Sequence, residues 1–254
     1  PVMLREWKTE WMKLRRRKVG MLLLAFLGFT GLWCAWVLSD ADPEDLIDGY
    51  RWVFANLSMI NTILLPTMIA MMASRICDME IKGNTLKLIC TMEKKGRLFD
   101  MKVLTGGLYL VLYVAAELAL LYLGGLAYGF GNPIQLRHVL YFAIQNVPVS
   151  LVLYLLQMML SFWFENQIIP LAAGIFGSFI GLFSWFFSDT NLFRWIFVWG
   201  HYSLLHFIGN TWDEETRIVT YYNVEPNWAA LCLVLAVLIG GYLVSKYLFV
   251  RKEI

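Results

Sequence analysis

Residues 75–102 read RICDMEIKGNTLKLICTMEKKGRLFDMK and separate two long apolar segments with a charged stretch that is also basic. Seven of these residues are Lys or Arg. Because the flanking sequence has the composition of helix embedded in lipid, this stretch is where the chain can meet a soluble partner. Its position and charge therefore bear on both topology and function.

The composition is that of a membrane protein. Of the 254 residues, 59% are hydrophobic and only 16% are charged. That is far more apolar surface than one soluble core can bury. We find no low-complexity linker or short-period repeat, so we expect one all-α membrane domain over residues 1–254.

Six segments are apolar over about 20 residues, the length that a helix needs to cross a bilayer. They run approximately over Val19–Leu38, Trp52–Ala73, Val103–Tyr128, Val139–Trp163, Ile168–Phe187 and Trp228–Leu248. Placing both termini in the cytoplasm puts 17 of the 21 Lys and Arg residues inside, as the positive-inside rule requires. The sequence thus predicts six transmembrane helices.

The segment Leu192–Ile208 is apolar but contains Arg194, His201 and His206, with Gly200 near its middle. Counting it as a seventh span would move the basic C-terminal end outside, against the positive-inside rule. We therefore interpret it as a re-entrant or interfacial part of an outer loop over residues 188–227.

Two basic amphipathic patterns lie on the predicted cytoplasmic side. Residues 1–18 carry Leu and Trp at helical spacing among basic residues, which predicts a helix lying on the membrane surface. In the loop 75–102, the residues Ile81, Thr85, Leu88 and Met92 form a mostly apolar stripe. This second helix can dock in the groove of another protein or rest on lipid. We expect glycines at its two ends, Gly83 and Gly96, and re-entry into the membrane at Lys102.

Glu117 is the only acid within the predicted spans. An unpaired charge there costs at least about 2.5 kcal/mol, so the carboxyl must be protonated, paired or solvated. It marks either a transport path or a helix interface, opposite Asn61, Gln145, Asn146 or Gln157.

Acidic residues collect in the first outer loop. An outer loop of this charge can attract cationic peptides, although it is also the ordinary complement of a positive inside. The residues concerned are Asp40, Asp42, Glu44, Asp45 and Asp48.

The chain lacks the usual signatures of a cofactor or nucleotide site. The four cysteines form no CxxC pair, so neither a disulfide framework nor a metal site is expected. The phosphate-binding pattern GxxxxGK[ST] is absent, so we expect any ATP to be hydrolysed by a partner. Nothing in the sequence points to nucleic acid.

Two short motifs resemble those of type-two ATP-binding-cassette (ABC) permeases. Glu10–Arg16, ahead of the first span, looks like the Glu-x-x-Lys-x-(Lys/Arg) entry of that family. The loop 75–102 resembles its coupling segment through Glu80, Asn84, Lys87, Arg97 and Lys102. Lys95-Gly96-Arg97 departs from the Pro-hydroxyl-Arg turn of many members. In size and motifs, the chain is most similar to compact permeases that protect bacteria from lantibiotics.

The resemblance implies a non-catalytic permease in a bacterial cell membrane. A separate ABC ATPase, carrying ATP and Mg²⁺, would dock on the loop, and a second permease, either the same chain or a paralogue, would complete the complex. The complex would export a peptide from the lipid bilayer. The expected coupling residues are Glu80, Asn84, Thr85, Lys87, Leu88, Met92 and Arg97.

Other functions remain open on the sequence alone. The exporter could take another lipophilic substrate, or the chain could be a scaffold subunit without transport. A secondary transporter usually needs more buried ionisable groups than Glu117. An intramembrane enzyme would have to use His201, His206 and Ser178, which form no recognisable triad or metal set.

Overall fold

The computed structural model describes residues 11–12, 14–39, 41–42, 45–82, 94–188, 190–212, 214 and 219–252. Its helices are α2 (Val19–Val37), α3 (Gly49–Lys82), α5 (Lys95–Tyr128), α6 (Leu136–Trp163), α7 (Ile168–Ser184), α8 (Leu192–Ile196), α9 (His201–Leu204) and α10 (Trp228–Arg251). The 3-10 turns η1 (Asp45–Asp48) and η2 (Val198–Gly200) and the strands β1 (Ile208–Trp212) and β2 (Val219–Asn223) complete it.

Each apolar segment predicted from the sequence forms a helix. Five helices, α2, α3, α5, α6 and α10, are long and apolar enough to cross a membrane. The sixth, α7, has 17 residues and reaches about 25 Å, slightly less than the hydrocarbon thickness of about 30 Å. The expected helical membrane protein is confirmed, whereas a sixth crossing by α7 stays a prediction.

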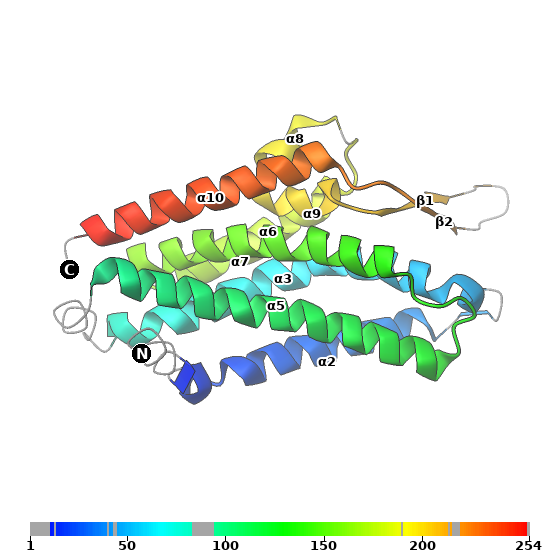
Figure 1. The fold of residues 1–254 in the computed structure, drawn as a ribbon, viewed down its shortest axis with the longest axis horizontal. Helices are drawn as coiled ribbons and strands as arrows, with labels where there is room; N and C mark the ends of the chain where they lie inside the picture. Colours follow the sequence, from blue (N-terminus) through cyan, green and yellow to red (C-terminus); the bar gives the residue numbers. More distant parts are fainter. Residues whose placement is uncertain are drawn as a thin grey trace.

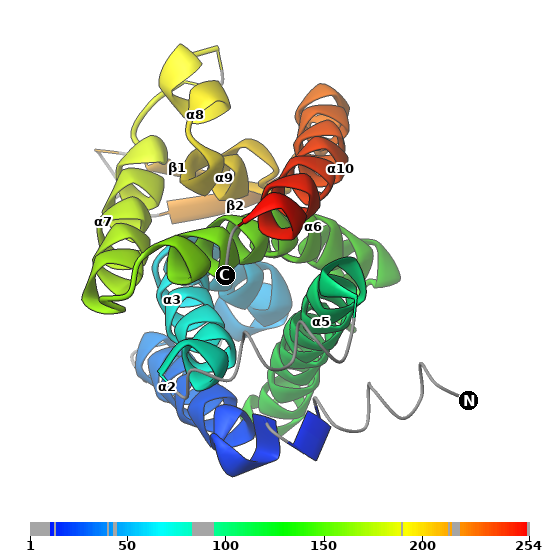
Figure 2. The same ribbon diagram turned by 90° about the vertical axis from the view of Figure 1, so that its left-hand side faces the viewer.

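The long helices run along one axis of the molecule and share two ends (Figure 1). At one end α2 begins, α3 ends, α5 begins and α10 ends (Figures 1 and 2). We call this the loop end, because the 83–93 connection joins α3 to α5 there. The opposite end, which carries β1 and β2, is the hairpin end.

Helix α3 lies at the centre of the bundle and contacts α2, α5, α6 and α7. Glycines allow α7 to approach it closely, since a Cβ on Gly174 would lie 2.4 Å from Ala70 Cβ and one on Gly181 would lie 2.6 Å from Thr62 Cγ2. This contact surrounds Pro66, which cannot donate to the carbonyl of Thr62 as a helical residue otherwise would. Close packing thus joins α7 to the kink-prone part of α3.

Helices α3 and α5 are longer than a bilayer requires. Each has 34 residues, which gives a length of about 51 Å against a hydrocarbon thickness of about 30 Å. The additional turns are the charged residues 75–82 and 95–102. Both ends of the predicted loop 75–102 are therefore continuous with the neighbouring spans, and only residues 83–93 lie outside the described part.

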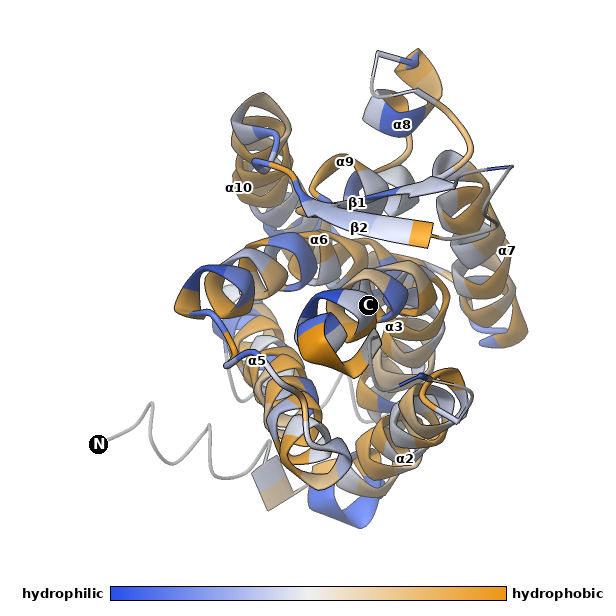
Figure 3. Cartoon of the chain, turned by 90° about the vertical axis from the view of Figure 1, so that its right-hand side faces the viewer, coloured by the Kyte–Doolittle hydropathy of each residue, from blue (hydrophilic) through white to orange (hydrophobic). Residues whose placement is uncertain are grey.

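Hydrophobic residues predominate in the long helices (Figure 3), and many of their large apolar side chains are exposed. Leu32 of α2 is 72% exposed, Phe176 of α7 is 70% exposed and Ile239 of α10 is 62% exposed. Exposed apolar surface of this extent would be unstable in water and is expected where helices face lipid.

The segment between α7 and α10 folds at the hairpin end. Helix α8 breaks at the extended residue Phe197, and η2 and α9 follow before the antiparallel pair of β1 and β2. The pairing places Ile208 opposite Asn223 and Trp212 opposite Val219. We did not predict this hairpin, although Val219–Asn223 (VTYYN) has the β-branched and aromatic composition of a strand.

The basic N-terminal segment packs against the bundle within the described residues. Residues 11–12 and 14–16 are helical, and the ring of Trp11 stacks on Tyr109 of α5 at 5.0 Å. Leu14 is buried. The apolar side of the predicted surface helix thus contacts protein at its C-terminal part.

Candidate functional site

Five of the seven expected coupling residues lie outside the described residues. Asn84, Thr85, Lys87, Leu88 and Met92 lie outside that part of the chain. Glu80 belongs to the last turn of α3, and Arg97 to the first turn of α5. Because α3 and α5 also contact each other, they bring both ends of the 83–93 connection to one place.

Lys102, the residue at which we expect the chain to re-enter the membrane, lies within α5. It is fully buried, and its amine donates to the carbonyl of Ile76 at 3.4 Å. The hydroxyl of Tyr154 in α6 donates to the Lys102 carbonyl at 2.9 Å. Lys102 thus packs between α3 and α6. Gly96, expected to end a docking helix, is instead the second residue of α5.

A three-residue cluster joins α5 to α10 near the loop end. Lys246 Nζ lies 2.7 Å from Asp100 Oδ2, and the Tyr242 hydroxyl donates to Asp100 Oδ1 at 2.7 Å. Sequence reasoning missed this contact because 146 residues separate the two ionised groups along the chain. Only the one-turn spacing of Tyr242 and Lys246 hinted that they share a face.

Glu117 lies at the centre of a polar network between helices. Its side chain is 0% exposed, and Oε2 accepts a hydrogen bond from Asn61 Nδ2 of α3 at 3.1 Å. The same amide nitrogen lies 3.4 Å from Asn146 Oδ1 of α6. Of the four partners considered, Asn61 therefore makes direct contact and Asn146 lies behind it.

Further polar side chains pair between the helices on either side of Glu117. Toward α2, the Tyr113 hydroxyl lies 3.3 Å from Thr30 Oγ1. Toward the hairpin end, Ser58 of α3 donates to Gln145 of α6, and the Gln145 amide donates to the carbonyl of Tyr202 at 2.8 Å. These bonds link α2 to α5 and, separately, α3 to α6 and α6 to α9 inside the apolar bundle.

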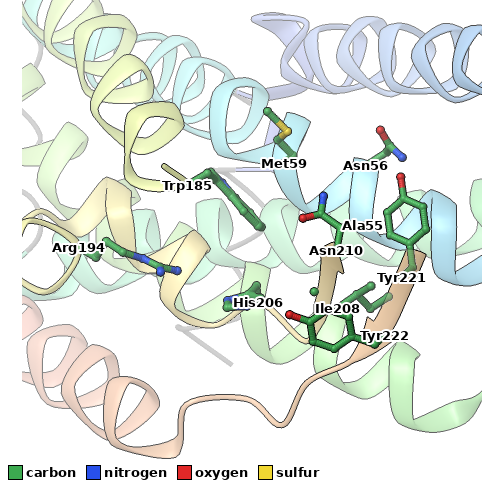
Figure 4. A pocket seen from close by; sticks show the side chains of 11 residues that line it. Ala55, Asn56, Met59, Trp185, Arg194, His206, Ile208, Asn210, Tyr221 and Tyr222 are labelled. Atoms are coloured by element: carbon green, nitrogen blue, oxygen red, sulfur yellow. The ribbon is translucent and has the colours of Figure 1, made fainter. Parts of the chain in front are cut away.

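A half-open polar cavity of about 210 Å³ lies at the hairpin end (Figure 4). The part of α3 nearest the hairpin end contributes Asn56 and Met59 to its wall, and the hairpin contributes Asn210 and Tyr221. Aromatic, amide and cationic groups face the cavity together, so it offers hydrogen bonds and ring faces. Its further lining residues are Ala55, Trp185, Arg194, His206, Ile208, Gly209 and Tyr222.

Arg194 forms hydrogen bonds within the segment between α7 and β1, which forms one side of this cavity. It is buried, and its Nε donates to Ser203 Oγ at 3.0 Å while Nη1 donates to the carbonyl of Phe187 at 3.1 Å. Nearby, His201 Nε2 bonds the carbonyl of Trp195. Burial lowers the pKa of His201 from its ordinary value of 6.5, so the ring is neutral at pH 7.

The acids proposed to attract peptides have varied surroundings. Asp40 and Glu44 lie outside the described residues, as does the side chain of Asp45. Asp42 is exposed. Asp48 accepts a bond from Asn132 Nδ2 at 2.6 Å and lies 3.2 Å from Arg51 Nη1, so it helps to hold η1 against the α5–α6 connection.

The arrangement does not favour the intramembrane enzyme. The Ser178 hydroxyl donates to the carbonyl of Ile175, whereas the ring of His201 faces the carbonyl of Trp195. Within the described ranges, no group of three or more His, Cys, Asp or Glu residues is placed to hold a metal ion.

Comparison with known proteins identifies the family. The family profile described as ABC-2 family transporter protein matches residues 7–181, which is more than half of the chain. No curated protein matches the chain closely. Members of this family are the membrane components of ABC transporters and work with an ABC ATPase. The chain, a helical membrane protein with a polar network in its centre, therefore belongs to the ABC-2 transporter family as a permease that is not itself catalytic.

Proposed function

We propose that this permease exports a lantibiotic or a similar antimicrobial peptide from the bacterial cell membrane and so protects the cell. One observation supports the coupling role above all others: α3 and α5 extend beyond the bilayer length at the same end and contact each other. A docked ATPase could move both helices through the 83–93 connection. The peptide substrate follows from the resemblance in size and motifs.

The loop end is the cytoplasmic end in this proposal. The residues near it carry most of the basic groups of the chain, which the positive-inside rule places in the cytoplasm. The polar cavity at the hairpin end would then face outward, where an exported peptide leaves. ATP and Mg²⁺ belong to the ATPase, and a second permease, the same chain or a paralogue, completes the complex.

Another lipophilic substrate is the second candidate. Growth in the presence of a lantibiotic distinguishes the two substrates, and co-purification of the ATPase tests the coupling contact independently.

Substituting Glu80 or Lys87 by Ala is expected to reduce ATPase recovery at least about tenfold when the tagged permease is purified. The reason is that a charged hydrogen bond lost from an interface costs about 1.5–3 kcal/mol. Substituting Arg17, an exposed cation outside both the loop and the Glu10–Arg16 motif, provides the control. Equal ATPase recovery with all three variants would contradict the coupling assignment.

Cells that express the permease with its ATPase are expected to tolerate at least about fourfold more lantibiotic than cells with an ATPase-dead variant. Growth at increasing peptide concentration measures this. Neutralising the five acids Asp40, Asp42, Glu44, Asp45 and Asp48 to the corresponding amides should lower the tolerance most at low salt, because salt screens charge attraction. If cells with the wild-type complex tolerated no more lantibiotic than the ATPase-dead cells, the peptide substrate would be rejected. If the amide variant gave the same tolerance as the wild type at low and high salt, charge attraction by these acids would be rejected.

A further inference from the structure

An apolar groove of about 400 Å³ lies between α6 and α10. Helix α6 lines it from Val152 to Trp163, and α10 lines it from Val237 to Leu248. Both stretches are described without a gap, and among their lining residues Ser245 carries the one hydroxyl group. Figure 2 shows α10 and α9 on the same side of α6. The groove therefore offers contacts to hydrocarbon and few to a polar ligand.

Small residues on α10 keep this space open. Gly241 and Ser245 are one helical turn apart, and both line the groove. Among the described residues, a Cβ added at Gly241 would meet Leu155 Cδ1 alone, at 4.0 Å, so α6 and α10 do not fill the space between them. On the same face of α10, Val244 and Leu248 are exposed. The groove is thus continuous with the apolar surface that this membrane protein presents to lipid.

The groove has an inner end at η2, which contributes Val198 to its lining. Four residues later, the Tyr202 hydroxyl lies 2.9 Å from Ser150 Oγ of α6, so the segment that carries η2 is fixed against α6 beside Val152. At the other end of the groove, Trp163 is 50% exposed where α6 ends. Indole rings are enriched at the interface between membrane and water. The groove therefore leads inward from the interface at the loop end.

The length of the groove matches one leaflet of a bilayer. With a rise of about 1.5 Å per residue, the lined stretches of α6 and α10 are each about 17 Å long. One leaflet contributes about 15 Å of hydrocarbon, which is half of the full thickness. A single acyl chain that enters beside Trp163 would thus reach Val198 within its own leaflet.

We propose that the groove binds one acyl chain of a phospholipid from the leaflet at the loop end. Its methylene groups pack between α6 and α10, its headgroup stays beside Trp163, and its methyl end contacts Val198. The segment between α7 and β1, to which Val198 belongs, also forms one side of the polar cavity. A bound chain therefore supports that side of the cavity from within the bilayer. This inference rests on membership of a membrane-protein family and is independent of the peptide substrate.

The test is native mass spectrometry of the purified permease with its ATPase, titrated with dipalmitoyl or dioctanoyl phosphatidylcholine. We expect the wild type to bind the long-chain lipid at least about tenfold more tightly, because the short chain leaves about half of the groove empty. The variant G241L should bind the long-chain lipid at least about tenfold more weakly than the wild type, since the leucine side chain occupies the middle of the groove.

The variant G240L is the matched control. It carries the same substitution one position earlier, where an added Cβ meets no heavy atom within 4 Å and the residue does not line the groove. It should bind the long-chain lipid as the wild type does. Equal affinity of G241L and G240L would overturn the proposal, as would equal affinity of the wild type for the two lipids, which would indicate a headgroup site. Loss of the second permease from G241L with lipid binding intact would show that a second chain occupies the groove instead.

A phosphatidylcholine with a photoreactive diazirine halfway along one acyl chain gives a second measurement. In vesicles, it should label residues 155–160 of α6 in the wild type and in G240L, and G241L should lose this label at an equal amount of protein. If G241L does not accumulate, the wild type decides the question. Labelling of the wild type confined to other helices would overturn the proposal.

Discussion

Replacing Gly174 by leucine in α7 is expected to lower the melting temperature of the purified protein by roughly 5–10 °C, or to prevent its accumulation in the membrane. A Cβ at this position would lie 2.4 Å from Ala70 Cβ, an atom fixed directly to the backbone of α3. It would also lie 3.4 Å from the carbonyl oxygen of Pro66. Because neither atom can rotate away, α7 would have to separate from α3.

The chain offers a matched control for this substitution. Gly240 lies in α10, and a Cβ added there meets no heavy atom within 4 Å. Replacing Gly240 by leucine should therefore leave the melting temperature within about 2 °C, because leucine is also the better helix former. If the two variants unfolded at the same temperature, that result would contradict the close packing of α7 against α3 at Gly174.

Replacing Glu117 by leucine is expected to destabilise the protein by about 1–3 kcal/mol, because the buried amide of Asn61 loses the shorter of its two hydrogen bonds. Replacing Glu117 by glutamine should cost far less, since the amide oxygen can still accept from Asn61. Thermal unfolding in detergent measures both. Equal destabilisation by leucine and glutamine would show that the hydrogen bond to Asn61 contributes little.

The same glutamine variant separates the two interpretations of Glu117. Its complete burial and its contacts with α3 favour a helix interface, so we expect peptide export by the glutamine variant to remain within about twofold of wild type. Cells with matched amounts of each protein should be compared for lantibiotic tolerance. Abolished export at normal abundance would mean that transport uses the charge or the proton of this carboxyl.

Hydropathy predicted the helices well because lipid requires a long apolar run for each span, and that requirement is visible within one local segment. The same reasoning placed the ends of α2, α6 and α7 within a few residues. It shortened α3 and α5, because the charged last turns of α3 and the charged first turns of α5 lie beyond the apolar run while the helical hydrogen bonds continue.

Contacts between distant segments could not be predicted in this way. The pair of Asp100 and Lys246 depends on how α5 packs against α10, and neither residue differs locally from other charges near a membrane surface. Glu117 was recognisable as unusual because it is an acid within a span, yet its contact with Asn61 was one of four open choices. The cavity at the hairpin end is formed partly by β1 and β2, and from the sequence we expected these residues to belong to an outer loop.

Because α3 is longer than the bilayer, a tilt of this helix moves both of its ends. Only its middle part is needed to cross the bilayer, while its loop-end turns adjoin the 83–93 connection and its opposite end forms a wall of the polar cavity. Because α7 packs closely around Pro66, we treat α3 as one unit, and a tilt of about 5° over a length of about 51 Å displaces one end by about 4 Å relative to the other. A small push on one side of the membrane would thus be felt as a change of cavity width on the other.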